Sequence, residues 1–202
     1  MAEQLSYNQL DVLKEMGTIG SATAATALAD MLATKVEIAV PQVTMVPLEN
    51  VGNVLAKMDQ MFFILDMAVL GDVKGRIFFL LPPDDAKFLA ATLLSQPKEA
   101  MDFNDEMFKS ALKEVCNILG GSYVSAMADM AKFTINISPP SMAIDMIGAI
   151  LDFIFIQIAE ESDEALYIKT DITIKGLKLN GLFLLFPTTE SLHKVFDALN
   201  IK

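Results

Sequence analysis

Residues 27–41 read ALADMLATKVEIAVP, and residues 126–140 read AMADMAKFTINISPP. The two stretches align without a gap and end in Pro41 and Pro140, which are 99 residues apart. A segment that occurs twice at such a long interval is not typical of a solenoid, which repeats a shorter unit many times. The sequence therefore predicts a duplicated half-domain, with the two halves related by a pseudo-twofold axis.

Other parts of the chain support the same duplication. The word LKE occurs at residues 13–15 and again at 112–114, with the same offset of 99 residues. Residues 79–82 read FLLP and residues 184–187 read LLFP, and each closes a strand-like run before a polar-led helix. The repeat thus extends from the start of each half to its end.

The chain has 202 residues, a length that suits one domain or two small fused halves. We expect a single domain over 1–202, with halves of about 1–97 and 98–202. The polar segment 96–102 is expected to link the halves. Because the duplication already supplies two related halves, we expect a monomer.

Each half shows the same order of predicted elements: a long helix, several strands and a short helix. The long helices are rich in Ala, Leu, Met, Lys and Glu, and the strands show alternation or continuous apolar runs. Predicted helices cover 7–33, 84–95, 103–131 and 189–199; predicted strands cover 36–40, 61–69, 74–81, 133–137, 148–160, 165–175 and 178–186. This order predicts an α+β fold with one continuous, mostly antiparallel sheet and the long helices packed on it.

The composition excludes several kinds of chemistry. The chain has 15 Lys and Arg against 26 Asp and Glu, a net charge of -11, which argues against nucleic acid as a partner. Cys116 is the only cysteine and His193 the only histidine. One chain therefore cannot form a disulfide or a Cys/His metal site, and a catalytic triad would have to use His193. We expect Cys116 to be a core thiol and His193 to be structural or exposed.

The sequence also argues against the membrane and the secretory route. Its first residues lack the basic and apolar regions of a signal peptide. The most apolar long stretch, 141–159, is interrupted by Asp145 and Asp152 and is too short to span a bilayer. With one cysteine and an acidic surface, the chain is expected to be cytoplasmic and not inserted in a membrane.

A polar stripe marks the second long helix. Ser110, Glu114 and Asn117 follow the spacing i, i+4, i+7, so they lie within roughly 60° of one another on the helix. Leu112 and Val115 lie beside them and suit a buried face. We call Ser110, Glu114 and Asn117 the second stripe; it should point outward with one carboxylate and one primary amide.

The first long helix carries a matching set, the first stripe, which consists of Asp11, Glu15 and Thr18. It has the acid but no amide. Taken alone, an acid and an amide on a helix are typical of an ordinary solvated face. However, asparagine is unfavourable in the middle of a helix, so Asn117 needs a further reason for its place.

Glycines in both predicted helices are a second unusual feature. Gly17 and Gly20 in the first, and Gly120 and Gly121 in the second, each cost about 0.5–1 kcal/mol relative to alanine. Two explanations remain open. Either another backbone approaches closely beside the stripes, or the glycines let the helices sit tightly on the sheet.

The two stripes resemble a family signature. The second stripe, followed by 22 residues and then Pro140, fits the pattern [Asp/Ser]-x3-Glu-x2-Asn-x22-Pro of the CheC, CheX and FliY phosphatases of chemotaxis. The first stripe, with Pro41 at the same distance, fits it except for Thr18. The surrounding words LKEMG at 13–17 and YVSAMAD at 123–129 are similar to those of CheC. Pro41 and Pro140 are expected to be architectural, each ending the first strand region of its half.

The resemblance implies a phosphatase of the phosphorylated response regulator CheY. In this family the asparagine, here Asn117, positions a water for attack on the aspartyl phosphate, and the glutamate, here Glu114, holds the regulator in register. The resemblance implies no cofactor in this chain, because the regulator brings its own Mg²⁺. It also implies that Ser110, the first residue of the motif, contacts the partner, and that the receptor deamidase CheD is a second partner.

Thr18 departs from the pattern, because a threonine has no amide and a shorter reach. We expect the first stripe to be weak or inactive, or to bind through Asp11 and Glu15 without catalysis. The competing hypothesis for the whole chain is a non-catalytic adaptor of the same fold, either flagellar-switch-like or CheD-binding. Because the whole chain is acidic, Lys109 and Lys113 are the candidates for local charge complementarity with the regulator.

Overall fold

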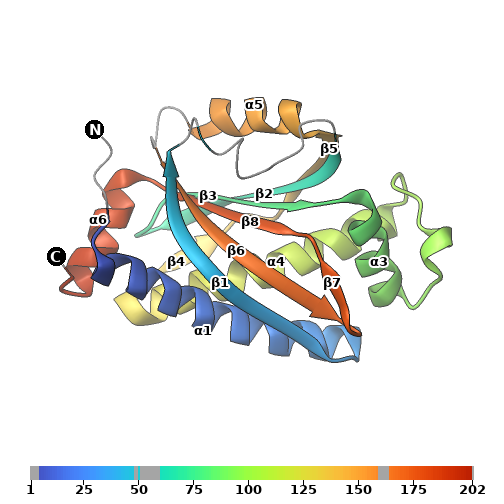
Figure 1. The fold of residues 1–202 in the computed structure, drawn as a ribbon, viewed down its shortest axis with the longest axis horizontal. Helices are drawn as coiled ribbons and strands as arrows, with labels where there is room; N and C mark the ends of the chain where they lie inside the picture. Colours follow the sequence, from blue (N-terminus) through green and yellow to red (C-terminus); the bar gives the residue numbers. More distant parts are fainter. Residues whose placement is uncertain (1–4, 48–49, 51–59, 159–163, 202) are drawn as a thin grey trace.

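The computed structural model describes residues 5–47, 50, 60–158 and 164–201. Its central element is one antiparallel sheet, against which the helices pack (Figure 1). Its helices are α1 (Tyr7–Leu32), α3 (Pro83–Leu94), the short 3₁₀ helix η2 (Lys98–Ala100), α4 (Glu106–Ala131), α5 (Ile147–Ile158) and α6 (Thr189–Ala198). Its strands are β1 (Val36–Pro47), β2 (Met61–Gly71), β3 (Gly75–Leu81), β4 (Ile135–Ile137), β5 (Ser141–Met146), β6 (Glu164–Ile174), β7 (Leu177–Leu179) and β8 (Leu182–Pro187).

The strand order reflects the duplication. The sheet runs β1-β6-β8-β3-β2-β4, with β5 also paired to β2 and β7 to β6. The two segments at its outer ends, β1 at 36–47 and β4–β5 at 135–146, are again 99 residues apart. Each pairs with a strand of the other half: β1 with β6, and β4 and β5 with β2. The central pair, β3 with β8, joins the two halves. The α+β fold with duplicated halves is confirmed; the exact boundary near residue 97 stays a prediction.

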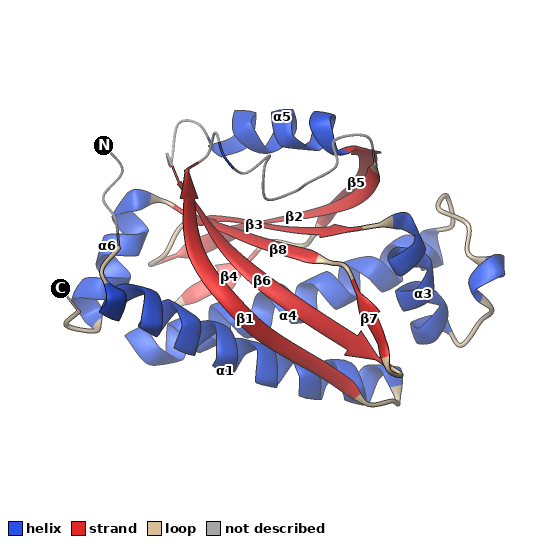
Figure 2. Ribbon diagram, viewed as in Figure 1, coloured by secondary structure: helices blue, strands red, loops and turns tan. Residues whose placement is uncertain are grey.

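Two cores lie on opposite faces of this sheet (Figure 2). Helices α1 and α4 lie side by side on one face, over the larger core, while α5 covers part of the other. Alternate residues of β2 serve the two cores: Leu65 and Met67 face the larger core, and Phe62 and Ile64 face the core beneath α5. The sheet is therefore the middle layer of the fold, and it separates α1 and α4 on one face from α5 on the other.

Capping residues explain where the two long helices begin. Ser6 forms a capping box with Gln9: the Gln9 N–H donates to Ser6 Oγ over 3.3 Å, and the Ser6 N–H donates to Gln9 Oε1 over 2.7 Å. Asp105 caps α4 by accepting a 2.9 Å hydrogen bond from the Met107 N–H. Each helix is followed by a left-handed residue, Ala33 after α1 and Lys132 after α4.

The strand predicted at 148–160 is wrong. Residues 147–158 form α5, and residues 159 and 160 lie outside the described part of the chain. The large apolar residues Phe153 and Ile156 are exposed on this helix, which hides the helical period in the sequence. The buried side shows intervals of three and four residues: Ile147, Ile150, Leu151, Ile154 and Ile158. None of the helices in the described ranges has the length and apolarity needed to cross a membrane.

The expected role of Pro41 is also wrong. Pro41 does not end a strand, because β1 continues to Pro47. It lies where the register of β1 on β6 shifts, between Ala39 and Gln42. A residue without an N–H is tolerated at such an irregularity because no ladder bond is required there. Pro140 does lie at a break, between β4 and β5, and the sequence reading missed β5 beyond it.

The helix glycines fulfil both of the roles left open by the sequence. Gly20 permits close contact between α1 and α4: a Cβ at this position would lie 2.9 Å from the Cα of Tyr123 and 3.1 Å from the carbonyl oxygen of Ser122. Gly17 and Gly120 instead face side chains of the sheet, Val40 and Met67 respectively. The close backbone approach is thus inside the molecule and not beside the stripes.

The left-handed residue after α1 gives a stability test. Ala33→Gly is expected to raise the free energy of unfolding by about 1 kcal/mol. The φ of 47° at Ala33 strains a residue that has a Cβ, whereas glycine adopts this φ without strain. Ala22→Gly, in the exposed interior of the same helix, should lower it by about 0.5–1 kcal/mol. Urea unfolding followed by circular dichroism measures both. A shift of both variants in the same direction would contradict the capping argument.

Candidate functional site

Both stripes lie on the surface of the helical face. Ser110, Glu114 and Asn117 are exposed on α4, in the half of the helix that follows its capped start. Asp11, Glu15 and Thr18 are exposed in the equivalent half of α1. The structure thus places every member of each stripe where a partner can reach it, as the helical spacing predicted.

The buried side of α4 fixes the direction of the second stripe. Leu112, Val115 and Leu119 are each only 1% exposed and belong to the core between the helices and the sheet. Their packing prevents rotation of α4 about its axis. The stripe is therefore held outward by core packing on the other side of the helix, which suits a rigid docking surface.

The acid and amide of the second stripe are available for a partner. Within the described part of the chain, neither the carboxylate of Glu114 nor the amide of Asn117 has a hydrogen bond or an ion pair. An exposed primary amide of this kind can donate one hydrogen bond and accept another at the same time. The amide of Asn117 can therefore hold a water molecule, and the carboxylate of Glu114 can hold a cationic group.

The first stripe is chemically different at its third position. The hydroxyl of Thr18 donates a 2.9 Å hydrogen bond to the backbone carbonyl of Lys14, four residues earlier in α1. The hydroxyl proton is therefore used inside the helix and does not point to a partner. Glu15 is exposed like Glu114, so the first stripe keeps its acid but has no free donor at the position of the amide.

Charges beside the second stripe are partly paired. Lys109 forms an ion pair with Glu106 at 2.6 Å on the first turn of α4. The hydrogen bond from Lys109, its charge, and the charge of Lys113 all lower the pKa of the Glu106 carboxyl. Of the two lysines expected to offer charge complementarity, Lys109 is thus engaged within the helix, and Lys113 is left as the better candidate.

The single cysteine and histidine are not part of this site. Cys116 is completely buried next to the stripe, and burial, with a smaller effect from Asp66, raises the pKa of its thiol far above the usual range. A thiol that remains protonated is a poor nucleophile. His193 is exposed on α6 and belongs to neither stripe.

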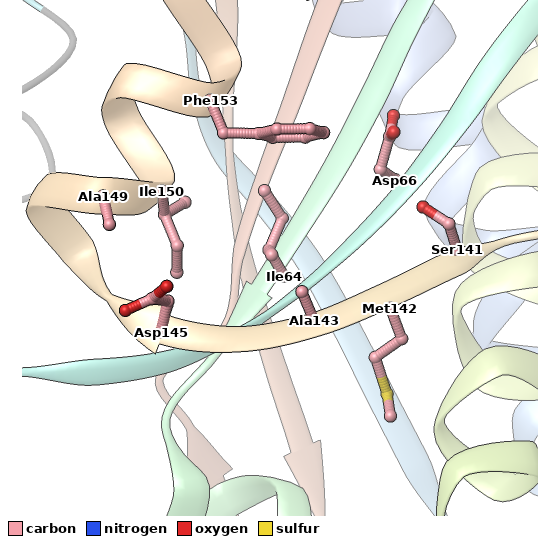
Figure 3. Close-up of a pocket in the computed structure, with 9 residues that line it drawn as sticks. All are labelled: Ile64, Asp66, Ser141, Met142, Ala143, Asp145, Ala149, Ile150 and Phe153. Atoms are coloured by element: carbon pink, nitrogen blue, oxygen red, sulfur yellow. The ribbon is translucent and has the colours of Figure 1, made fainter.

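A pocket that the sequence did not suggest lies between α5 and the strands β2 and β5 (Figure 3). Its volume is about 290 Å³, with Asp66 and Ser141 at one end, Asp145 at the other, and Phe153 and Ile64 between them. Asp66 is buried and forms a bidentate ion pair with Arg76, so its charge is already compensated. No sequence signal could have found this pocket, because its walls include α5 and β5, which were not predicted.

Comparison with known proteins identifies relatives. The model of the CheC-like family matches residues 9–45 and 107–144, which contain the two stripes, so the resemblance seen in the sequence is confirmed. A curated relative from Bacillus subtilis, the CheY-P phosphatase CheC, is 29% identical over 96% of this chain and 95% of its own length.

Solved structures agree on the fold. FliY from Thermotoga maritima has a TM-score of 0.77 at 22% identity, covering 99% of this chain and 98% of its own. CheX from Borrelia burgdorferi, solved in a complex with CheY, BeF₃ and Mg²⁺, has a TM-score of 0.50 at 20% identity, covering 84% and 96%. At these identities the two likenesses establish the architecture and no more.

Proposed function

Since both halves of the chain are CheC-like, we propose that this protein hydrolyses the aspartyl phosphate of a phosphorylated CheY response regulator. The observation that carries the proposal is the second stripe: an exposed acid and amide on a rigid helix, both without partners in the described structure. The CheC relative, whose name specifies CheY-P as its substrate, supports the same reaction.

The proposed chemistry needs little from this chain. Asn117 accepts a hydrogen bond from a water molecule and orients its oxygen in line with the phosphorus atom. The water oxygen bonds to phosphorus as the bond between phosphorus and the aspartate oxygen breaks, which releases inorganic phosphate and the free carboxylate. Mg²⁺ held by the regulator neutralises charge on the phosphoryl oxygens. Phosphoryl transfer depends mainly on such positioning and charge stabilisation, so a site without histidine or cysteine is sufficient.

Glu114 has a separate role in the proposal. Its exposed carboxylate, one turn before Asn117, pairs with a lysine of the regulator and fixes the register of docking. Ser110 lies one turn earlier and borders the contact, together with Lys113. The experiment is a dephosphorylation assay with phosphorylated CheY and Mg²⁺, in which this protein should accelerate the loss of phosphate. Binding without acceleration would favour the adaptor hypothesis instead.

The first stripe is proposed to dock without efficient catalysis, and restoring its amide tests this. In an Asn117→Ala background, Thr18→Asn should recover a measurable part of the lost rate, because the new amide lies one turn after Glu15 just as Asn117 follows Glu114. The companion Thr18→Val, similar in size to threonine but without a donor, should recover nothing. If neither variant recovers activity, the first stripe is not a degenerate copy of the site.

A CheD partner remains part of the proposal. The observation that favours a second protein contact is the exposed apolar surface of α5, where Ile156 is 75% exposed and where Ala149 and Phe153, which line the neighbouring pocket, are exposed as well. This surface lies on the face of the sheet opposite to the stripes. The phosphatase and adaptor roles are therefore sterically compatible in one chain.

A further inference from the structure

Two large apolar side chains, one exposed and one partly buried, lie along the edge of the second stripe. Met107 precedes Glu114 by seven residues and is 61% exposed, while Ile118 follows Glu114 by four residues and is only partly buried. At about 100° per residue these three side chains lie within roughly 40° of one another on α4. We call Met107 and Ile118 the apolar ridge. It runs along one side of the stripe, whereas Lys113 borders the other side.

Met107 has no structural task that would explain an exposed methionine. Only its backbone is used, since its N–H donates to the capping carboxylate of Asp105. Its side chain does not belong to either hydrophobic core, whereas Ile118 packs partly against the larger one. A single exposed apolar residue is common, but an exposed methionine in line with a partly buried isoleucine, on the helix face that carries the carboxylate of Glu114, forms a candidate contact surface.

The duplicated half offers an internal comparison. Ile19, at the position equivalent to Ile118, is 41% exposed and likewise follows the acid of its stripe by four residues. The position equivalent to Met107 is Asn8, an exposed polar residue. The first stripe therefore has the isoleucine of the ridge but not the methionine, and it has no amide. It differs from the second stripe in these two ways.

We propose that Met107 and Ile118 are the apolar anchor with which α4 docks the regulator, and that they determine its preference for the second stripe. This rests on the proposed function. Its occupant is the same regulator molecule that Glu114 and Asn117 contact, because the ridge lies along the edge of that stripe. A contact of this kind is made equally in the ground state and the transition state, so it changes KM and not kcat.

The test is steady-state dephosphorylation of phosphorylated CheY by Met107→Ser. We expect KM to rise about tenfold with kcat unchanged, because the buried apolar area of one side chain is lost from the complex. Met107→Leu should retain the wild-type KM. Leu177→Ser, which removes a similarly exposed apolar residue from β7, should also leave KM unchanged. A KM for Met107→Ser within twofold of wild type, or a fall in kcat at constant KM, would overturn the proposal.

A gain-of-function variant tests the same idea on the other helix. In the Asn117→Ala, Thr18→Asn background, Asn8→Met should lower the KM of the first stripe by several-fold. No decrease would contradict the anchor, even if Met107→Ser is impaired for another reason. Absence of any phosphatase activity in the wild-type protein would refute the proposed function itself; activity with no effect at Met107 or Asn8 would refute only the anchor.

Discussion

Asn117→Ala is expected to lower the kcat for dephosphorylation of phosphorylated CheY by about 100-fold, with KM nearly unchanged. The variant keeps Glu114, Lys113 and the helix surface, so docking should persist. It removes the primary amide of the second stripe, the group that is proposed to orient the attacking water molecule. Because Asn117 is fully outside the core, alanine at this position should not destabilise the fold, and it improves the helix propensity of α4.

Two controls make this experiment specific. Asn136→Ala removes another exposed amide, on β4, and should leave the rate unchanged. Asn117→Asp keeps the size of the side chain but replaces the donor with a negative charge facing the phosphoryl group, so it should be at least as impaired as alanine. A wild-type rate for Asn117→Ala would show that the second stripe is not the working site.

Gly20→Ala is expected to lower the free energy of unfolding by about 1–3 kcal/mol, because the added methyl group overpacks the contact between α1 and α4. The added Cβ would meet the backbone of α4 at the Cα of Tyr123 and the carbonyl of Ser122. Tyr123 cannot easily move away. Its ring stacks on Phe183 at 4.5 Å and its hydroxyl is 3.2 Å from the hydroxyl of Thr170 in β6.

Gly121→Ala is the matched control, because it adds the same methyl group to the middle of α4 where there is space. The nearest atom to a Cβ there is Cδ1 of Ile137, at 3.8 Å. Alanine should therefore raise the free energy of unfolding by about 0.5–1 kcal/mol through helix propensity alone. Urea denaturation with a common m-value measures both variants. If Gly20→Ala were as stable as Gly121→Ala, the close packing of α1 against α4 would be wrong.

The long helices and the stripes could be predicted from the sequence because several signals agree there. The caps at Ser6 and Asp105, the absence of proline and the spacing of buried residues such as Leu112 and Val115 all favour the same helix and the same outward face. The duplication adds weight, since a pattern seen twice at one offset is unlikely to arise by chance.

The errors occur where tertiary contacts decide the outcome. α5 is apolar on both its buried and its outer side, so composition alone favoured a strand. Pro41 looked like the end of a strand, yet the irregular pairing of β1 with β6 accommodates it. The sequence also does not show that Gly20 is tightly packed and Gly121 is not, because this depends on which residue of the neighbouring element faces each glycine. Met107 was overlooked because an exposed methionine has no signature of its own.

The exchange of edge strands between the halves bears on how such a chain arose. β2 obtains its outer neighbours from the second half, and β6 obtains its outer neighbour from the first. A half-length ancestor could have formed the same sheet only by associating with a second copy of itself. Gene duplication and fusion would have made that association permanent, and would have freed one of two identical surfaces to diverge. The difference between Thr18 and Asn117, and between Asn8 and Met107, is the kind of divergence that a fused pair tolerates and a symmetric homodimer cannot express on one side alone.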